Sequence, residues 1–302
     1  MKIAHIINPV KVVANSELGI AQPITFNSIL NAKKFAGSNI DIELYTVSYP
    51  EDREIIPNGF SQLPNLDKSI LDIGNFSTPK KYPFLKDVIG ALYTNSTADY
   101  LIYTNMDIVL MPQFYLAVAA YLQQGNDAIL INRRGISPKY QSINDLPLMY
   151  SEFGKPHPGF DCFVFHRSIF PKIILESICL GVSFSEVAMV HNLIAFAERL
   201  KLIDDLHLTF HIGSEVMPPL NGEYYNHNRN EYEKKIYPKL KPHLDIRKFP
   251  YAELPLHKRM IKWALNPVFR THQVSGMEGK NLVRKIKYQL DSWRFALLNR
   301  IR

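Results

Sequence analysis

Short apolar runs alternate with longer helical patterns along the first two thirds of the 302-residue chain, and this alternation limits the folds open to it. The apolar runs predict strands at 2–7, 40–47, 99–105, 127–132, 161–166 and 207–212. Helical patterns occupy residues 24–36, 83–96 and 112–124 between them. Strands alternating with helices indicate an α/β fold in which a mostly parallel sheet is flanked by helices.

Polar residues follow two of the predicted strands. Asn8 and Pro9 come directly after the first strand. Asn105 ends the run 99–105, and Asp107 lies at the start of the next segment. In open α/β sheets ligands bind beyond the carboxyl ends of the strands, so we expect these four residues to share one crevice. Burying an unpaired charge costs several kcal/mol, so Asp107 should lie at a mouth or have a partner. The alternative is that both polar pairs only form turns.

The basic charge of the chain is concentrated near its end. The net charge of +7 combines +9 over residues 255–302, from 11 Lys and Arg against two acidic residues, with −2 over the preceding 254 residues. Residues 282–301 carry apolar side chains at three- and four-residue steps among arginines and lysines. This pattern predicts an amphipathic helix, and residues 276–302 could bind an anionic membrane surface. The same face could instead close the core or a dimer contact. No nucleic-acid-binding motif accompanies these charges, so we do not expect a nucleic-acid partner.

The remaining composition is that of an ordinary globular protein, 46% hydrophobic. Residues 1–10 read as a first strand and not as a signal peptide, and no apolar run approaches the roughly 20 residues of a membrane span. Cys162 and Cys179 lie in apolar settings without a metal-type spacing, which predicts reduced core thiols. We therefore expect a cytoplasmic protein, peripheral on the membrane if the basic tail binds it.

An ordered set of motifs over residues 1–215 resembles the GT-A-type glycosyltransferases, which use nucleotide-sugar donors. The string Asn105-Met106-Asp107 follows a strand where the family carries an acidic Asp-x-Asp motif. The segment 157–170 is similar to a glycine-led strand on the acceptor side of the family's site. Glu186 lies where an acidic residue opens a later helix, and His211 lies just beyond the last strand. This sequence departs from the family in having Asn105 for the first Asp.

The resemblance implies a GT-A-like, Rossmann-like fold over residues 1–215, with donor and acceptor sites, and a helical C-terminal extension over 216–302. It implies that Asn105 and Asp107 hold a divalent metal and the donor diphosphate, and that His211 completes the metal site. Mn²⁺ or Mg²⁺ is the expected cofactor, because such ions combine few protein carboxylates with phosphate oxygens and water. Asn8 and Pro9 would contact the donor.

Two carboxylates are candidates for acceptor chemistry. An inverting transfer needs a general base within hydrogen-bond reach of the acceptor hydroxyl, and Glu186 and then Asp161 are the candidates. The alternative for Glu186 is a capping box, with Ser183 as N-cap, and Asp161 could merely begin a strand. The tyrosine-rich segment 222–240 could contact a sugar or pack its rings as an ordinary helix.

The sequence thus predicts a glycosyltransferase that moves a hexose-type sugar from a nucleotide sugar to a hydroxyl of a saccharide or lipid-linked glycan, as in polysaccharide biosynthesis. One alternative is a nucleotidyltransferase, but residues 8–22 contain only Gly19 and Lys11 for the loop that would hold a triphosphate. The other is a non-catalytic nucleotide- or sugar-binding protein on the same fold. Sequence patterns do not predict the oligomeric state.

Overall fold

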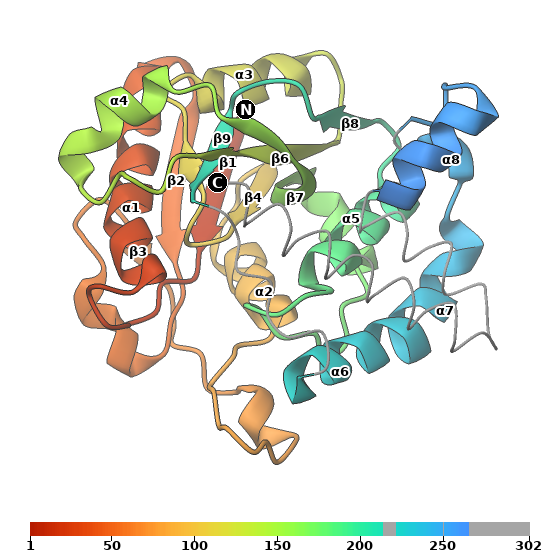
Figure 1. Ribbon diagram of the computed structural model, residues 1–302, viewed down its shortest axis with the longest axis horizontal. Helices are drawn as coiled ribbons and strands as arrows, with labels where there is room; N and C mark the ends of the chain where they lie inside the picture. Colours follow the sequence, from red (N-terminus) through yellow and green to blue (C-terminus); the bar gives the residue numbers. More distant parts are fainter. Residues whose placement is uncertain (214–221, 250, 266–302) are drawn as a thin grey trace.

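The computed structural model describes residues 1–213, 222–249 and 251–265 of the chain, and these form helices around one nine-stranded sheet (Figure 1). The strands are β1 (Lys2–Ile7), β2 (Asp41–Thr46), β3 (Ser61–Gln62), β4 (Tyr100–Thr104), β5 (Val109–Leu110), β6 (Ala128–Ile136), β7 (Lys155–His166), β8 (Leu200–Ile203) and β9 (Thr209–Ile212). The α-helices are α1 (Glu17–Ala36), α2 (Leu85–Asn95), α3 (Phe114–Gln123), α4 (Leu146–Ser151), α5 (Ser185–Phe196), α6 (Glu223–Asn230), α7 (Tyr237–Leu240) and α8 (Leu256–Leu265).

The sheet is mixed, although most of its strands run the same way. Its order is β3-β2-β1-β4-β7-β6-β9-β5, and β8 also pairs with β6. β7 is antiparallel to both β4 and β6, and β5 is antiparallel to β9, whereas the other pairings are parallel. β7 reverses direction because residues 137–154, which connect it to β6, contain only short helices and make no crossover to a parallel strand. The predicted α/β class with a mostly parallel sheet is confirmed, and the sheet additionally contains two antiparallel strands, β5 and β7.

Helices pack against apolar side chains on both faces of the sheet. Ile3 and Ile7 of β1 belong to a cluster with α1 and α3, and Ala4 and Ile6 between them belong to a cluster with α2 and α5. This alternation is the two-residue period of a strand covered on both sides, and it makes a sandwich of helices, sheet and helices. The sheet therefore presents only its edges and strand ends to a ligand.

The segment after residue 221 packs onto the same core as the sheet. Tyr225, Tyr232 and Tyr237 are buried in the cluster that contains β4 and β7, and Phe249 and Trp263 join it. The tyrosines of 222–240 therefore pack as an ordinary helical segment does. The predicted boundary between residues 215 and 216 and the predicted membrane-binding segment 276–302 lie outside the described residues. Among the described helices, none is long and apolar enough to cross a membrane.

Candidate functional site

The ends of β1 and β4 lie side by side at one edge of the sheet. The two strands are parallel neighbours, with Ile6 opposite Tyr103, so the residues that follow each strand leave from the same edge. The Asn8 side-chain amide donates a hydrogen bond of 2.7 Å to the Val47 carbonyl, which ties the end of β1 to the end of β2. Pro9 is buried beside it. Asn8 and Pro9 thus border the edge at which Asn105 and Asp107 emerge.

Asp107 meets His211 across this edge. Asp107 follows β4 within a turn closed by the Ile108 amide on the Asn105 carbonyl, and its Oδ2 lies 3.3 Å from Nε2 of His211 on β9. Burial raises the pKa of Asp107, but the hydrogen bond and charge of His211 outweigh it and the pKa lies below its usual value. Burial likewise lowers the pKa of His211, and Asp107 more than compensates, leaving it raised. The pair therefore favours an ionised carboxylate beside a protonated imidazole.

The second oxygen of Asp107 is the unusual atom of the site. Oδ1 is buried and has no hydrogen-bond partner among the described residues. A buried carboxylate oxygen without a donor is unfavourable, so this position suits an incoming cation or a ligand donor. Within the described part of the chain, no three His, Cys, Asp or Glu side chains gather as a complete metal site. Asp107 and His211 could hold a divalent ion only if phosphate oxygens or water supplied the other ligands.

The Asn105 side chain bridges Tyr103 and Asp161. Its Oδ1 accepts a hydrogen bond of 2.7 Å from the Tyr103 hydroxyl, and its Nδ2 donates to Asp161 Oδ1 at 3.2 Å. Both ends of the amide thus have protein partners, although its oxygen keeps a second lone pair. Burial raises the pKa of Tyr103 well above its usual range, and the charges of Asp107, Glu186 and Asp161 raise it further. The Tyr103 hydroxyl therefore stays protonated and lies among three carboxylates.

Asp161 is buried in an ion pair that the sequence analysis did not anticipate. Its Oδ2 lies 2.8 Å from Nη1 of Arg133 on the neighbouring strand β6, and the two side chains are 1% and 4% exposed. A general base must reach the acceptor hydroxyl, and this carboxylate points into the sheet toward Arg133 and Asn105. The placement favours a positioning role for Asp161 and leaves Glu186 as the better-placed candidate base.

Glu186 reaches the same cluster from the start of α5. A Cβ atom added to Gly159 of β7 would lie 3.8 Å from Glu186 Oε2 and 3.0 Å from the His157 ring. The Glu186 carboxylate therefore lies within van der Waals range of Gly159, which precedes Asp161 by two residues on β7. The expected capping box is wrong: α5 begins at Ser185, its N-cap is Phe184, and the Phe184 side chain makes no capping hydrogen bond. The Glu186 carboxylate is thus not used to cap the backbone of Ser183.

Five of the predicted residues thus gather at one edge of the sheet: Asn105, Asp107, Asp161, Glu186 and His211. The sequence analysis missed Arg133 and Tyr103. The available clue was the pair of arginines directly after the run 127–132, because a buried arginine needs a hydrogen-bonding partner. Arg133 has Asp161, and Arg134 has the carbonyls of residues 153 and 154.

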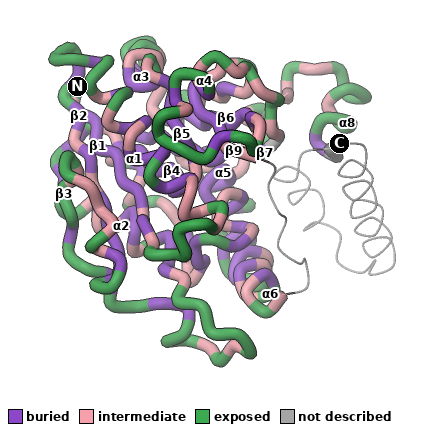
Figure 2. Tube along the Cα trace, turned by 60° about the vertical axis from the view of Figure 1, so that its left-hand side comes forward, coloured by how far each residue is buried: buried purple, intermediate pink, exposed green. Residues whose placement is uncertain are grey.

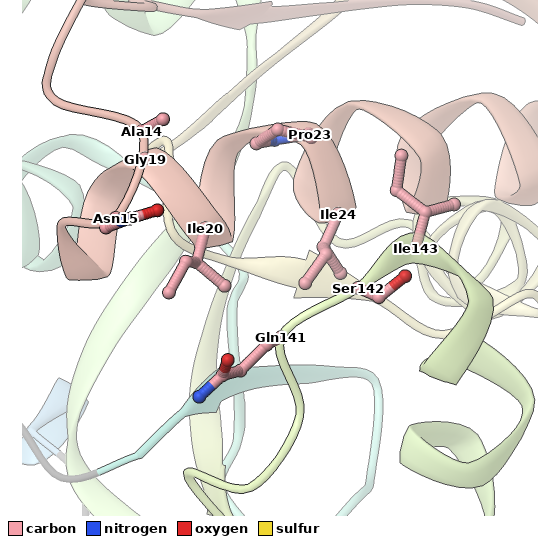
Figure 3. Close-up of a pocket in the computed structure, with 9 residues that line it drawn as sticks. All are labelled: Ala14, Asn15, Gly19, Ile20, Pro23, Ile24, Gln141, Ser142 and Ile143. Carbon is pink, nitrogen blue, oxygen red and sulfur yellow. The ribbon is translucent and has the colours of Figure 1, made fainter.

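A separate hollow of about 350 Å³ lies between the start of α1 and residues 141–143 (Figure 3). Ile20 and Ile24 of α1 face Gln141 and Ser142 across it. No charged side chain lines it. Two of its lining residues, Ala14 and Asn15, belong to the connection that begins at Asn8, so the hollow adjoins the loop bordering the candidate site.

No protein-family model and no curated protein matches the chain. Solved structures that match include Staphylococcus aureus TarS residues 1–349 with UDP-GlcNAc, at 12% identity and a TM-score of 0.42 over 91% of this chain and 88% of that one. Another is the mannosyltransferase PcManGT from Pyrobaculum calidifontis with GDP-Man and Mn²⁺, at 11% identity and a TM-score of 0.43 over 97% of this chain and 80% of that one. A third is 4-diphosphocytidyl-2C-methyl-D-erythritol synthase from Anaerococcus prevotii, at 12% identity and a TM-score of 0.38 over 78% of this chain and 99% of that one. All three TM-scores lie below 0.5.

Proposed function

We propose that the chain is a nucleotide-sugar-dependent glycosyltransferase acting on a hydroxyl of a saccharide or lipid-linked glycan. The observation that carries the proposal is the buried Asp107 Oδ1, which lacks a donor at the edge where β1 and β4 end. Such an edge is where α/β sheets bind nucleotide ligands, and an unsatisfied carboxylate oxygen there fits a cation accompanying a diphosphate. Asn8 and Pro9 would border the donor.

Asp107 and His211 would hold Mn²⁺ or Mg²⁺ together with the donor diphosphate. When bound, the cation supplies positive charge that offsets the charge developing on the departing phosphate oxygens. Binding requires that His211 give up its proton to ligate, and Asp107 would then share its carboxylate between the imidazole and the ion. The hydrogen bond from the Tyr103 hydroxyl to Asn105 would hold the Asn105 side chain in place two residues before Asp107.

Glu186 is proposed as the general base of an inverting transfer. Its carboxylate would accept the proton of the acceptor hydroxyl while that oxygen forms a bond to the anomeric carbon. The bond from the anomeric carbon to the phosphate oxygen breaks at the same time, and the nucleoside diphosphate leaves with the electron pair. Asp161 and Arg133 would keep Asn105 in place beneath these groups.

A nucleotidyltransferase has less support from the contacts at the end of β1. Lys11, the one lysine of residues 8–22, pairs with Glu54 at 2.6 Å, and Gly19 lies inside α1. Neither is arranged as a loop whose amides and lysine would hold a triphosphate.

The testing experiment measures thermal stability with UDP, GDP and their sugar conjugates, each with and without Mn²⁺. A ligand at 100 times its Kd should raise the free energy of unfolding by about 2.7 kcal/mol, which appears as a higher Tm. We expect this gain to need both nucleotide and metal and to vanish in Asp107→Asn, but to persist in Asp205→Asn, a matched change of an exposed carboxylate on the β8–β9 connection.

Release of nucleoside diphosphate in the presence of saccharide acceptors then separates catalysis from binding. Glu186→Gln should keep the nucleotide-dependent gain in Tm and lose turnover. A gain in Tm without turnover in the unmodified protein, for any acceptor tested, would favour the binding-protein alternative. No gain with any nucleotide would refute the donor site at Asp107.

A further inference from the structure

The outer surface of α8 carries large apolar side chains that no part of the described chain covers. Leu256, Met260 and Ile261 are 63%, 48% and 59% exposed. We call these three residues the α8 apolar strip. Three such residues within one ten-residue helix exceed the scattered single exposures that an ordinary protein surface shows.

One side of α8, which includes Trp263 and adjoins Leu256 on the helical wheel, is fixed to the protein. Trp263 is 5% exposed and its ring lies against that of Phe249, with ring centroids 6.0 Å apart. The Arg259 guanidinium lies 5.0 Å from the centre of the Trp263 ring, and its Nη1 donates to the Ala252 carbonyl at 3.1 Å. The helix is therefore anchored by one side, and Figure 2 shows it at the periphery of the described chain, with exposed residues along its length.

Cationic side chains flank the strip. Lys258 and Lys262 are exposed and lie one helical turn apart, and His257 lies exposed between Leu256 and Ile261 on the wheel of the helix. Residues 256–265 contain no Asp or Glu. An amphipathic helix with an apolar arc and a cationic edge is the composition that lies in the interface of an anionic bilayer, with the apolar side chains below the headgroups.

We propose that α8 docks on an anionic lipid surface through the α8 apolar strip, with Lys258 and Lys262 at the headgroup phosphates. Two copies of the same cationic face would repel each other, which disfavours a dimer through this face. Nucleic acid would gain little from exposed aliphatic side chains, because bases stack on aromatic rings. This proposal is independent of the transferase reaction and does not depend on residues 276–302.

The direct test places an environment-sensitive fluorophore at position 260 of the full chain. The two native cysteines, Cys162 and Cys179, are buried, so a single Met260→Cys is labelled selectively. The matched control is Leu148→Cys on α4, an apolar side chain that is 59% exposed. With vesicles of equal phosphatidylglycerol and phosphatidylcholine, we expect a blue shift and a several-fold intensity gain at 260 and none at 148. Vesicles of phosphatidylcholine alone should leave both labels unchanged.

Flotation of the unlabelled protein provides the second measurement. Exchanging all three strip residues for glutamate should reduce binding to the anionic vesicles at least tenfold, whereas Leu148→Glu should not, with circular dichroism and Tm checking both folds. An unshifted label at 260, or undiminished flotation of the folded triple variant, would overturn the proposal. A blue shift that rises with protein concentration and needs no vesicle would assign the strip to self-association instead.

Discussion

Two histidines of the sheet are both largely buried, and yet their pKa values are shifted in opposite directions. His5 in β1 is 1% exposed, with Nδ1 2.7 Å from the Tyr115 hydroxyl and Nε2 2.9 Å from Thr104 Oγ1. Burial lowers the pKa of His5 to about 3. The His211 side chain is 15% exposed and has Asp107 as its partner, and its pKa is raised. The partner, hydroxyl or carboxylate, therefore decides whether a buried imidazole carries charge.

The same contrast separates the core from the candidate site. Around His5, neutral hydroxyls satisfy both ring nitrogens, so this part of the core closes its hydrogen bonds without ions. At the edge of the sheet, Asp107 pairs with His211 and Asp161 pairs with Arg133, and Asp107 Oδ1 has no donor among the described residues. A folded core gains nothing from such an arrangement, and a site that binds a charged ligand does.

The largest expected effect follows from breaking the buried ion pair of the site. Arg133→Met leaves the Asp161 carboxylate buried without its cation, and removing one partner of such a pair costs about 3–5 kcal/mol. Urea unfolding at pH 7 measures the loss. The double variant Arg133→Met with Asp161→Leu should recover most of it, because the uncompensated charge is gone. A loss below about 1 kcal/mol in the single variant would mean that water or another group already solvates Asp161.

The second prediction concerns activity. Asp107→Asn keeps the shape of the side chain but removes its charge, and we expect kcat/KM for sugar transfer to fall about 100- to 1000-fold, comparable to losing one transition-state hydrogen-bond donor. Tm without ligand should change little, since Asp107 Oδ1 has no hydrogen bond to lose and the partly exposed pair of Oδ2 with His211 contributes only about 0.5 kcal/mol. The exposed control Asp205→Asn should retain full activity. Equal losses in both variants would attribute the effect to net charge and not to the site.

Sequence patterns predicted the elements well where burial has a clear period. The strand run ending at Tyr103 and the helix beginning near Phe114 follow from apolar spacing alone, and Asp107 was predicted to lie at a mouth or to have a partner. Direction was harder to predict, because residues 161–166 read as a strand whichever way they run. Only the length and content of residues 137–154 set β7 antiparallel.

Side-chain partners could not be predicted in the same way. Asp161 was expected at the acceptor, and the structure pairs it with Arg133 on β6. The register of β6 against β7 shifts between residues 131 and 134, so the sequence does not tell which of the two successive arginines lies on the face of Asp161. A register shift of one residue exchanges the two faces of a strand, and no sequence period reports it. The pairing of Asp107 with His211 likewise depends on β5 pairing with β9, where Val109 lies opposite Phe210, and this joins residues about a hundred positions apart.

The third prediction tests the lowered pKa of the buried His5. Because the pKa of His5 is lower in the folded state than in the unfolded state, the unfolded chain binds the extra proton below about pH 6.5, and stability falls as the pH falls through that value. We expect His5 alone to remove about 2 kcal/mol between pH 7.5 and pH 5. In His5→Gln this part of the pH dependence should be absent, whatever the stability of the variant at pH 7.5. Urea unfolding at both values measures the difference, and equal slopes in the two proteins would show that His5 protonates without unfolding.

The smallest effect is expected at His211, and it has the opposite sign. The raised pKa of His211 means that its pairing with Asp107 stabilises the fold fully below the unfolded value near 6.5, and that this stabilisation is lost as the pH rises through the folded pKa. Both side chains contact solvent in part, so about 0.5 kcal/mol is a reasonable size. Wild type should therefore exceed His211→Gln in the free energy of unfolding at pH 6 by more than it does at pH 8.5.

Metal and salt make this comparison sharper. Added Mn²⁺ competes with the proton for the His211 imidazole. If Asp107 and His211 face one ligand position, Mn²⁺ should therefore stabilise wild type more than His211→Gln, and this extra stabilisation should be larger at pH 8.5 than at pH 6. High salt should weaken the difference at pH 6 between wild type and His211→Gln, whereas the His5 effect, which involves no ion pair in the folded state, should persist. If the His211 difference instead grows with pH, the imidazole is neutral in the folded protein, and the two histidines would differ in exposure but not in charge.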